Sequence, residues 1–144
     1  MAGRLEIRIG KRVFTANLLG KEAPNTCKVI QGILPIKGEA MQVRWSGEAM
    51  YVALPLEKWD FTLEPENLTI YGCRGDVLLF SDLDAPRGYK EFIIVYGKAH
   101  LRSRAGALRS NLFAEITENL SELRIIGEDL VRKGVQGISI KMLK

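Results

Sequence analysis

The residues best suited to chemistry in this chain lie in one basic segment. His100, Arg102, Arg104 and Arg109 fall close together with no acidic residue among them. Such a segment can form an electropositive rim that attracts an anionic ligand, or it can be a solvated loop with basic residues. We expect no contact with nucleic acid, because no aromatic residues that could stack on bases are interleaved with these arginines.

Two charged residues outside this segment, Arg44 and Glu48, could take part in the same chemistry. Arg44 and Arg102 could together bind a carboxylate, because a guanidinium can bind both oxygens of the group. Alternatively, Arg44 pairs with Glu48 across a hairpin. Histidine is the side chain that titrates near neutral pH, so His100 and Glu48 could form a base with an orienting carboxylate, or His100 could simply be solvated.

The sequence carries no nucleophile elbow, P-loop, Rossmann glycine pattern or zinc motif. We expect no metal site, because the chain has a single histidine, and we expect no cofactor. Cys27 and Cys73 match no metal spacing, and we expect two buried thiols rather than a disulfide. These absences leave no established catalytic motif.

Composition predicts an ordinary globular protein with one domain over residues 1–144. Hydrophobic residues make up 47% of the 144 residues, charged residues make up 26%, and the formal net charge is +4. Charges interrupt the apolar residues from the N-terminus onward, so we expect no signal peptide. No apolar run approaches the roughly 20 residues of a membrane span, so we expect a cytoplasmic protein with no membrane partner. A homo-oligomer is possible.

Alternating apolar and polar residues predict about nine short strands. Residues 5–9 and 14–18 form an opening hairpin around Gly10 and Lys11. Further strands are predicted over residues 41–45, 50–54, 67–71, 76–80, 91–96, 112–117 and 138–142. Short turns between most of them favour an antiparallel barrel or sandwich over a doubly wound sheet, which would need a helix after nearly every strand.

Two helices interrupt the strands. The first is predicted to begin at Pro24, whose ring suits the first helical position, and to bury Cys27, Ile30 and Leu34 along one stripe. The second follows Asn119, which with Glu122 gives a pattern similar to a capping box.

Several ordered motifs resemble the cyclophilins. Ala23-Pro24-Asn25-Thr26 is similar to the start of the first cyclophilin helix, and the stretches over 75–80 and 91–95 resemble the paired central strands. Small bacterial cyclophilin-like proteins of unknown function are more similar still, over residues 44–48, 51–55, 75–77, 96–98 and 111–123. The resemblance covers nearly the whole chain. It implies a mainly β fold, a closed antiparallel barrel of about eight strands with two helices, and no established reaction.

The isomerase site of the cyclophilins is matched in part. Arg44 is similar in position to the arginine that stabilises the twisted X–Pro amide. Glu91 and Ile93 replace the glutamine and phenylalanine of the isomerase pocket, and residues 102–110 replace its tryptophan and histidine. A prolyl isomerase with a degenerate site is therefore one alternative function.

The resemblance also groups the polar candidates for a ligand site. Barrel mouths are common ligand sites when a few polar groups converge on an apolar wall. We expect a small anionic or amide-containing ligand there, bound by Arg44, Glu48, Tyr51, Tyr96, His100, Arg102 and Asn111. The structural alternatives are barrel packing for Tyr51, a core cap for Tyr96 and loop hydrogen bonding for Asn111.

A non-catalytic accessory module for a metabolic enzyme is the third function class. Trp59 and Phe61 lie in a loop flanked by prolines and could form an interface. They could equally belong to a loop that folds over one end of the barrel.

Overall fold

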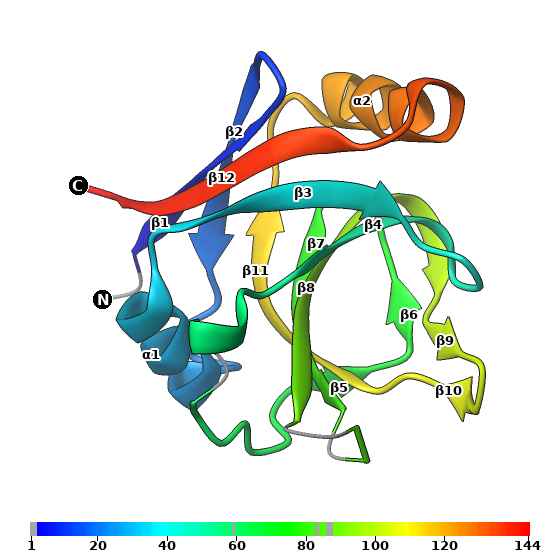
Figure 1. Ribbon diagram of the computed structural model, residues 1–144. Helices are drawn as coiled ribbons and strands as arrows, with labels where there is room; N and C mark the ends of the chain where they lie inside the picture. The colour runs from blue at the N-terminus through cyan, green and yellow to red at the C-terminus, as the bar shows by residue number, and fades with distance from the viewer. Residues whose placement is uncertain (1–2, 59, 83, 86–87) are drawn as a thin grey trace.

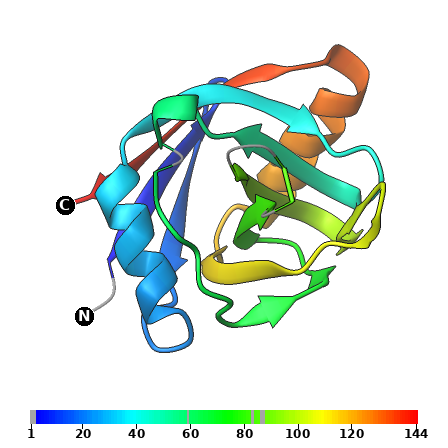
Figure 2. The ribbon, with the colours of Figure 1, turned by 60° about the horizontal axis from the view of Figure 1, so that its bottom comes forward.

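Eight strands pair edge to edge and close into an antiparallel barrel in the computed structural model, which describes residues 3–58, 60–82, 84–85 and 88–144. The helices are α1 (Pro24–Ile33) and α2 (Leu120–Lys133), with a short 3-10 turn at Leu56–Lys58. The strands are β1 (Arg4–Ile9), β2 (Arg12–Leu18), β3 (Ile36–Gln42), β4 (Gly47–Ala53), β5 (Leu68–Thr69), β6 (Tyr71–Gly72), β7 (Asp76–Asp82), β8 (Tyr89–His100), β9 (Arg102–Ser103), β10 (Gly106–Ala107), β11 (Ser110–Ile116) and β12 (Gln136–Leu143). The prediction of a closed barrel with two helices is confirmed (Figures 1 and 2).

Strand pairing fixes the order around the barrel as β2, β1, β12, β3, β4, β8, β7 and β11. The predicted opening hairpin is present, with Ile7 opposite Phe14 and Gly10 in the left-handed region at the turn. Pairing of β11 with β2, where Ala114 lies opposite Leu18, closes the ring. Closure leaves these eight strands no free edge.

Apolar side chains fill the barrel interior. Phe14, Phe92 and Phe113 are fully buried there, and the rings of Phe92 and Phe113 have centroids 5.6 Å apart. Burying each such side chain stabilises the fold by about 1.5–3 kcal/mol. The interior is therefore a packed core.

Helix α1 begins at Pro24 as predicted, but its first turn is held from outside the helix. Ala23 at the N-cap position has no side chain that could accept a hydrogen bond. The carboxylate of Glu66 accepts instead, from the backbone N–H of Asn25 (3.2 Å) and from the backbone N–H and hydroxyl of Thr26 (both 2.8 Å). These bonds satisfy donors that a helix start leaves without partners.

Helix α2 lies across one end of the barrel, at the top of Figure 1. The predicted capping box at its start is wrong, because Asn119 adopts a left-handed backbone (φ 58°) and makes no side-chain cap. A capping side chain requires an extended N-cap residue, whereas asparagine tolerates the left-handed region. Glu122 instead lies 3.5 Å from Arg12 in an ion pair.

The outer face of β4, β8 and β7 carries a second apolar cluster. Ala49, Leu78, Ile93 and Val95 are buried on this face, and Leu101 packs with them from the segment that follows β8. The sequence predicted a loop over residues 100–109, but β9 and β10 pair there as a small hairpin. Leu101 and Leu108, which flank this hairpin, pack against the barrel wall.

The strands differ from prediction in three further places. The strand predicted over 41–45 ends at Gln42, the one predicted over 67–71 divides into β5 and β6, and β8 extends to 12 residues. The expectation of two buried thiols is half wrong. Cys27 is buried and donates to the carbonyl of Phe113 (3.5 Å), while Cys73 is exposed, and both are free.

In the described part of the chain, neither helix combines the length and apolar character needed to cross a bilayer.

Candidate functional site

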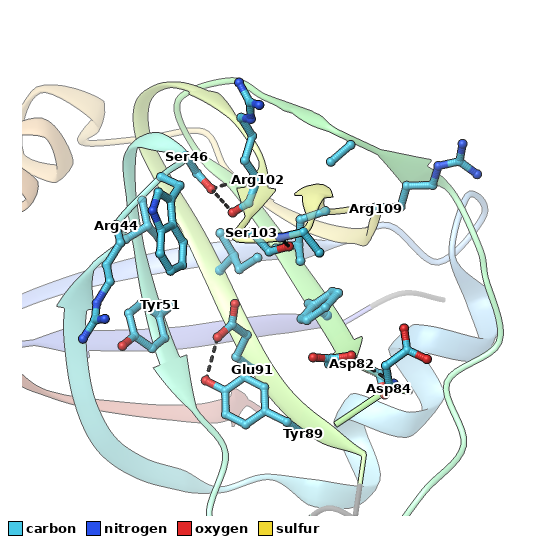
Figure 3. A pocket seen from close by; sticks show the side chains of 18 residues that line it. Arg44, Ser46, Tyr51, Asp82, Asp84, Tyr89, Glu91, Arg102, Ser103 and Arg109 are labelled. Atoms are coloured by element: carbon cyan, nitrogen blue, oxygen red, sulfur yellow. Dashed lines mark hydrogen bonds between the residues drawn. The ribbon is translucent and has the colours of Figure 1, made fainter. Parts of the chain in front are cut away.

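A cavity of about 690 Å³ lies on the outer face of the barrel wall, between β4, β8, β7 and the β9–β10 hairpin (Figure 3). Tyr51, Phe80, Glu91 and Ile93 form its wall. Alternation along each strand turns these side chains away from the core, so that Glu91 and Ile93 face outward while Phe92 and Ile94 face inward. This cavity thus differs in place from the barrel mouth named by the sequence prediction, and core side chains fill the interior.

A hydrogen-bonded carboxyl and phenol lie within the cavity. The hydroxyl of Tyr89 donates to Glu91 Oε2 at 2.7 Å. Burial raises the pKa of Glu91, the bond from Tyr89 opposes this shift, and the charge of Asp82 adds to it. Burial and the neighbouring Glu91 also raise the pKa of Tyr89. The cavity thus contains a carboxyl group that holds a proton more readily than an ordinary glutamate.

Two aspartates stand beside this pair in Figure 3. Asp82 Oδ1 accepts a hydrogen bond from the backbone N–H of Asp84 (3.0 Å), and both residues line the cavity. Ser81 Oγ, also at the cavity, is buried and has no hydrogen-bond partner among the described residues. No group of three metal-ligating side chains is found in the described ranges.

Arginines form the rim of the cavity. Arg44, Arg102 and Arg109 line its edge, and the guanidinium groups of Arg102 and Arg109 point away from Glu91 in Figure 3. Ser46 connects the two sides of this rim, since its hydroxyl accepts from the backbone N–H of Arg102 (2.9 Å) and donates to the Arg102 carbonyl (3.1 Å). The segments that carry Arg44 and Arg102 are therefore joined by the hydrogen bonds of Ser46, while the long arginine side chains extend into solvent.

Three of the seven residues predicted from the sequence meet at this cavity, namely Arg44, Tyr51 and Arg102. Glu48 lies outside it. Its carboxylate pairs with Arg124 of α2 and accepts from the backbone N–H of Lys98 (3.0 Å), and these bonds lower its pKa. The predicted pair of Arg44 and Glu48 is wrong, because Glu48 contacts α2 instead.

The other three residues also lie elsewhere. Tyr96 is 3% exposed and belongs to the core, and its hydroxyl donates to Gln42 Oε1 (2.6 Å). His100 is exposed, with its ring centroid 5.0 Å from that of Tyr71, and does not meet Glu48. Asn111 is buried and donates from Nδ2 to Thr26 Oγ1 (3.0 Å) and to the carbonyl of Glu64 (2.8 Å).

Sequence reasoning missed the acidic half of the cavity. Tyr89, Asp82 and Asp84 were not proposed, and Glu91 was noted only as a departure from the isomerase pocket. A glutamate one residue before an apolar run was the available signal. Of the two loop aromatics, Phe61 packs against the core with Lys90 Nζ 4.8 Å from its ring centroid, while Trp59 lies outside the described residues.

Comparisons with known proteins identify a family and a fold. A family profile described as "Protein of unknown function (DUF3830)" matches residues 5–142. McbB, solved in complex with tryptophan, superposes with a TM-score of 0.72 at 15% identity, over 95% of this chain and 44% of McbB. The hypothetical protein AF2241 from Archaeoglobus fulgidus, solved in solution, gives a TM-score of 0.61 at 18% identity over 99% of this chain and 95% of its own. These two likenesses concern the fold alone.

The chain thus spans less than half the length of McbB. A search of curated proteins gave no match.

Proposed function

The chain belongs to the DUF3830 family, and from its outer-wall cavity we propose that the protein binds a small carboxylic acid or amide. The observation that carries this proposal is that one cavity brings together acidic side chains, apolar side chains and a rim of arginines. A ligand of this class offers a matching group to each of the three.

The size and lining of the cavity support a small organic ligand. A volume of about 690 Å³ falls within the range of small-molecule sites. Tyr51, Phe80 and Ile93 offer apolar surface to the body of a ligand. Glu91 can accept a hydrogen bond from an amide N–H when ionised, and can donate one to a carbonyl when protonated.

The rim supplies the preference for negative charge. Arg44 and Arg102 both line the cavity, and a guanidinium that turns inward can bind both oxygens of a carboxylate. Both arginines are exposed, so the turn requires only rotation of long solvated side chains. Tryptophan, bound by the structural neighbour McbB, combines a carboxylate with an apolar body, and it belongs to the ligand class proposed here.

Prolyl isomerase activity, implied by the cyclophilin resemblance, is the second candidate. Its supporting observation is that Arg44 shares the cavity with apolar Ile93 and Phe80. Against it, Glu91 and Tyr89 place polar groups where an apolar proline ring would be received. A protease-coupled assay on X–Pro peptides tests it, and activity that Arg44→Ala abolishes would favour the isomerase.

The ligand proposal is tested by thermal shift and calorimetry with a panel of small acids and their amides. A charged hydrogen bond contributes about 1.5–3 kcal/mol, so Arg102→Ala should weaken binding about 10–100-fold. Arg104→Ala is the matched control, because Arg104 is exposed in the same hairpin and does not line the cavity. A panel without any stabilising compound, or equal effects of the two substitutions, would refute the proposal.

A further inference from the structure

The cavity lacks a positioned nucleophile among its described residues. The Ser46 hydroxyl is held by the backbone of Arg102, and Ser103 Oγ accepts from the backbone N–H of Ala105 (3.1 Å). Ser81 Oγ has no acceptor among the described residues that could take its proton. Covalent catalysis therefore has no support here, whereas proton transfer does.

We propose that Glu91 is a catalytic base that removes a proton from the carbon next to the carbonyl group of a bound carbonyl acid or amide. This inference rests on the proposed function and deepens it by naming a reaction at the same site. The substrate class is a small carbonyl compound with an acidic C–H bond and a negative or amide group at its other end.

The proton step balances without a further reactant. The Glu91 carboxylate takes the proton, the electron pair of the C–H bond forms a C=C bond, and the carbonyl π electrons move to oxygen. Protonated Glu91 then returns the proton to the enolate oxygen, giving the enol, or to the same carbon, giving the starting ketone. The net reaction is a tautomerisation, and neither oxidation nor reduction takes place.

The position of Glu91 carries the argument. It is partly buried in the cavity wall, flanked by the apolar side chains of Phe80 and Ile93, so a substrate that fills the cavity excludes water from the carboxylate. A carboxylate without its water shell is a stronger base toward a C–H bond. Protons move quickly between oxygen or nitrogen atoms in water but leave carbon slowly. A positioned base therefore accelerates a reaction most when the proton is removed from carbon.

Charged and titratable groups surround Glu91 from each element around the cavity. They are Tyr89 on β8, Asp82 on β7, Asp84 after it, Tyr51 on β4, Arg44 before β4, Arg102 on β9 and Arg109 before β11. Burial raises the pKa of Glu91, the bond from Tyr89 opposes this shift, and the charge of Asp82 adds to it.

Tyr89 is a positioning residue in this scheme. Its hydroxyl fixes one carboxylate oxygen at 2.7 Å and leaves the other oxygen for the substrate. Because the bond stabilises the ionised form, Tyr89→Phe should raise the pKa of Glu91 further. The pH at which activity is half-maximal should then move upward.

The experiment uses the full chain in D₂O with 2-oxobutyrate, 3-phenylpyruvate and 2-oxobutanamide as probes. Proton NMR follows the loss of the C3–H signal, and the rate in buffer alone is subtracted. We expect exchange by the wild type, and a fall of about 100-fold or more in Glu91→Gln, the usual size of a general-base contribution. Glu39→Gln, an exposed glutamate on β3, is the matched control.

Binding of the same probes separates the two proposals. If a probe binds but exchanges no faster than in buffer, or if Glu91→Gln exchanges at the wild-type rate, Glu91 is not the base while the ligand site stands. If no probe and no member of the wider panel binds, both proposals fail. Tyr89→Phe must shift the pH profile and Tyr71→Phe, an exposed tyrosine outside the cavity, must not. Equal profiles for these two variants would remove Tyr89 from the scheme.

Discussion

Gly127 of α2 offers a direct test of how the helix rests on the barrel. The helix approaches the Tyr96 ring so closely that a Cβ atom on Gly127 would lie 2.2 Å from Tyr96 Cγ, and 2.3 and 2.4 Å from the two Cδ atoms. Real Cβ contacts under 3.0 Å are essentially never seen. Gly127→Ala must therefore displace either the ring or the helix.

Two opposing effects set the magnitude. Alanine favours the helix over glycine by about 1 kcal/mol, while overpacking a core costs about 1–3 kcal/mol. The whole ring lies against the new methyl group, so the cost should fall at the upper end. We expect a net loss of about 1–2 kcal/mol in the free energy of unfolding, or about 3–7 °C in Tm for a domain of this size.

Gly32 of α1 is the matched control. A Cβ atom there meets nothing within 4 Å. Gly32→Ala should therefore keep the gain in helix propensity without the clash, and stabilise the protein by up to about 1 kcal/mol.

Urea denaturation followed by circular dichroism measures both variants. In a Tyr96→Ala background the penalty at Gly127 should disappear, giving a coupling energy of about 1 kcal/mol or more. If Gly127→Ala stabilised the protein as much as Gly32→Ala, the close packing of Gly127 against the Tyr96 ring would be refuted.

Two further predictions concern the first helix and the thiols. Removal of the Glu66 carboxylate in Glu66→Ala should destabilise the protein by about 1–2 kcal/mol near neutral pH. Burial opposes ionisation of Glu66, but its bonds from Asn25 and Thr26 outweigh this and lower its pKa in the folded state. Its contribution is thus present above the unfolded-state pKa and lost as pH falls through the folded-state value, so pH-dependent denaturation curves of wild type and variant should converge in acid. A thiol reagent should modify exposed Cys73 under native conditions, but should modify buried Cys27 only after unfolding. Burial, and then the charge of Glu66, raise the pKa of the Cys27 thiol to about 11. Mass spectrometry of the labelled peptides checks this, and equally fast labelling of both cysteines would contradict it.

Local patterns predicted most strands and both helices and favoured a barrel or sandwich, whereas the closed barrel was implied by the cyclophilin resemblance. Strict alternation over residues 5–9 and the turn at Gly10 define a strand and its hairpin without reference to the rest of the chain. Pro24 and the buried stripe after it likewise locate α1. The end of β3 at Gln42 was not predictable in this way, because the apolar residues at 43 and 45 continue the alternation while the backbone leaves the strand to form the cavity edge.

Contacts between distant segments explain what the sequence could not predict. Glu66 holds the start of α1 from a loop 40 residues away. Asn111 bonds to Thr26 across 85 residues, and Glu48 reaches Arg124 across 76. Asn111 and Glu48 were therefore predicted as ligand residues, because their partners lie far along the chain. A polar side chain in a strand cannot be assigned to a site until the packing of helices and loops against that strand is known.

The register of β8 explains why the side chains of Tyr51 and Tyr96 lie on opposite faces of the barrel wall. Tyr51 lies directly opposite Ile93 in the β4–β8 pair, and directly opposed residues in a sheet point to the same face. Ile93 faces the cavity, so Tyr51 does too, while Tyr96, three positions along β8, faces the core with Phe92 and Ile94. The apolar run over 92–96 is buried on both faces, inside by the core and outside by a second cluster that includes Leu101 and Leu108. Hydrophobicity alone could not tell these two faces apart, but strand parity can, and it selects Glu91 together with Tyr89 as the polar end of the outer face.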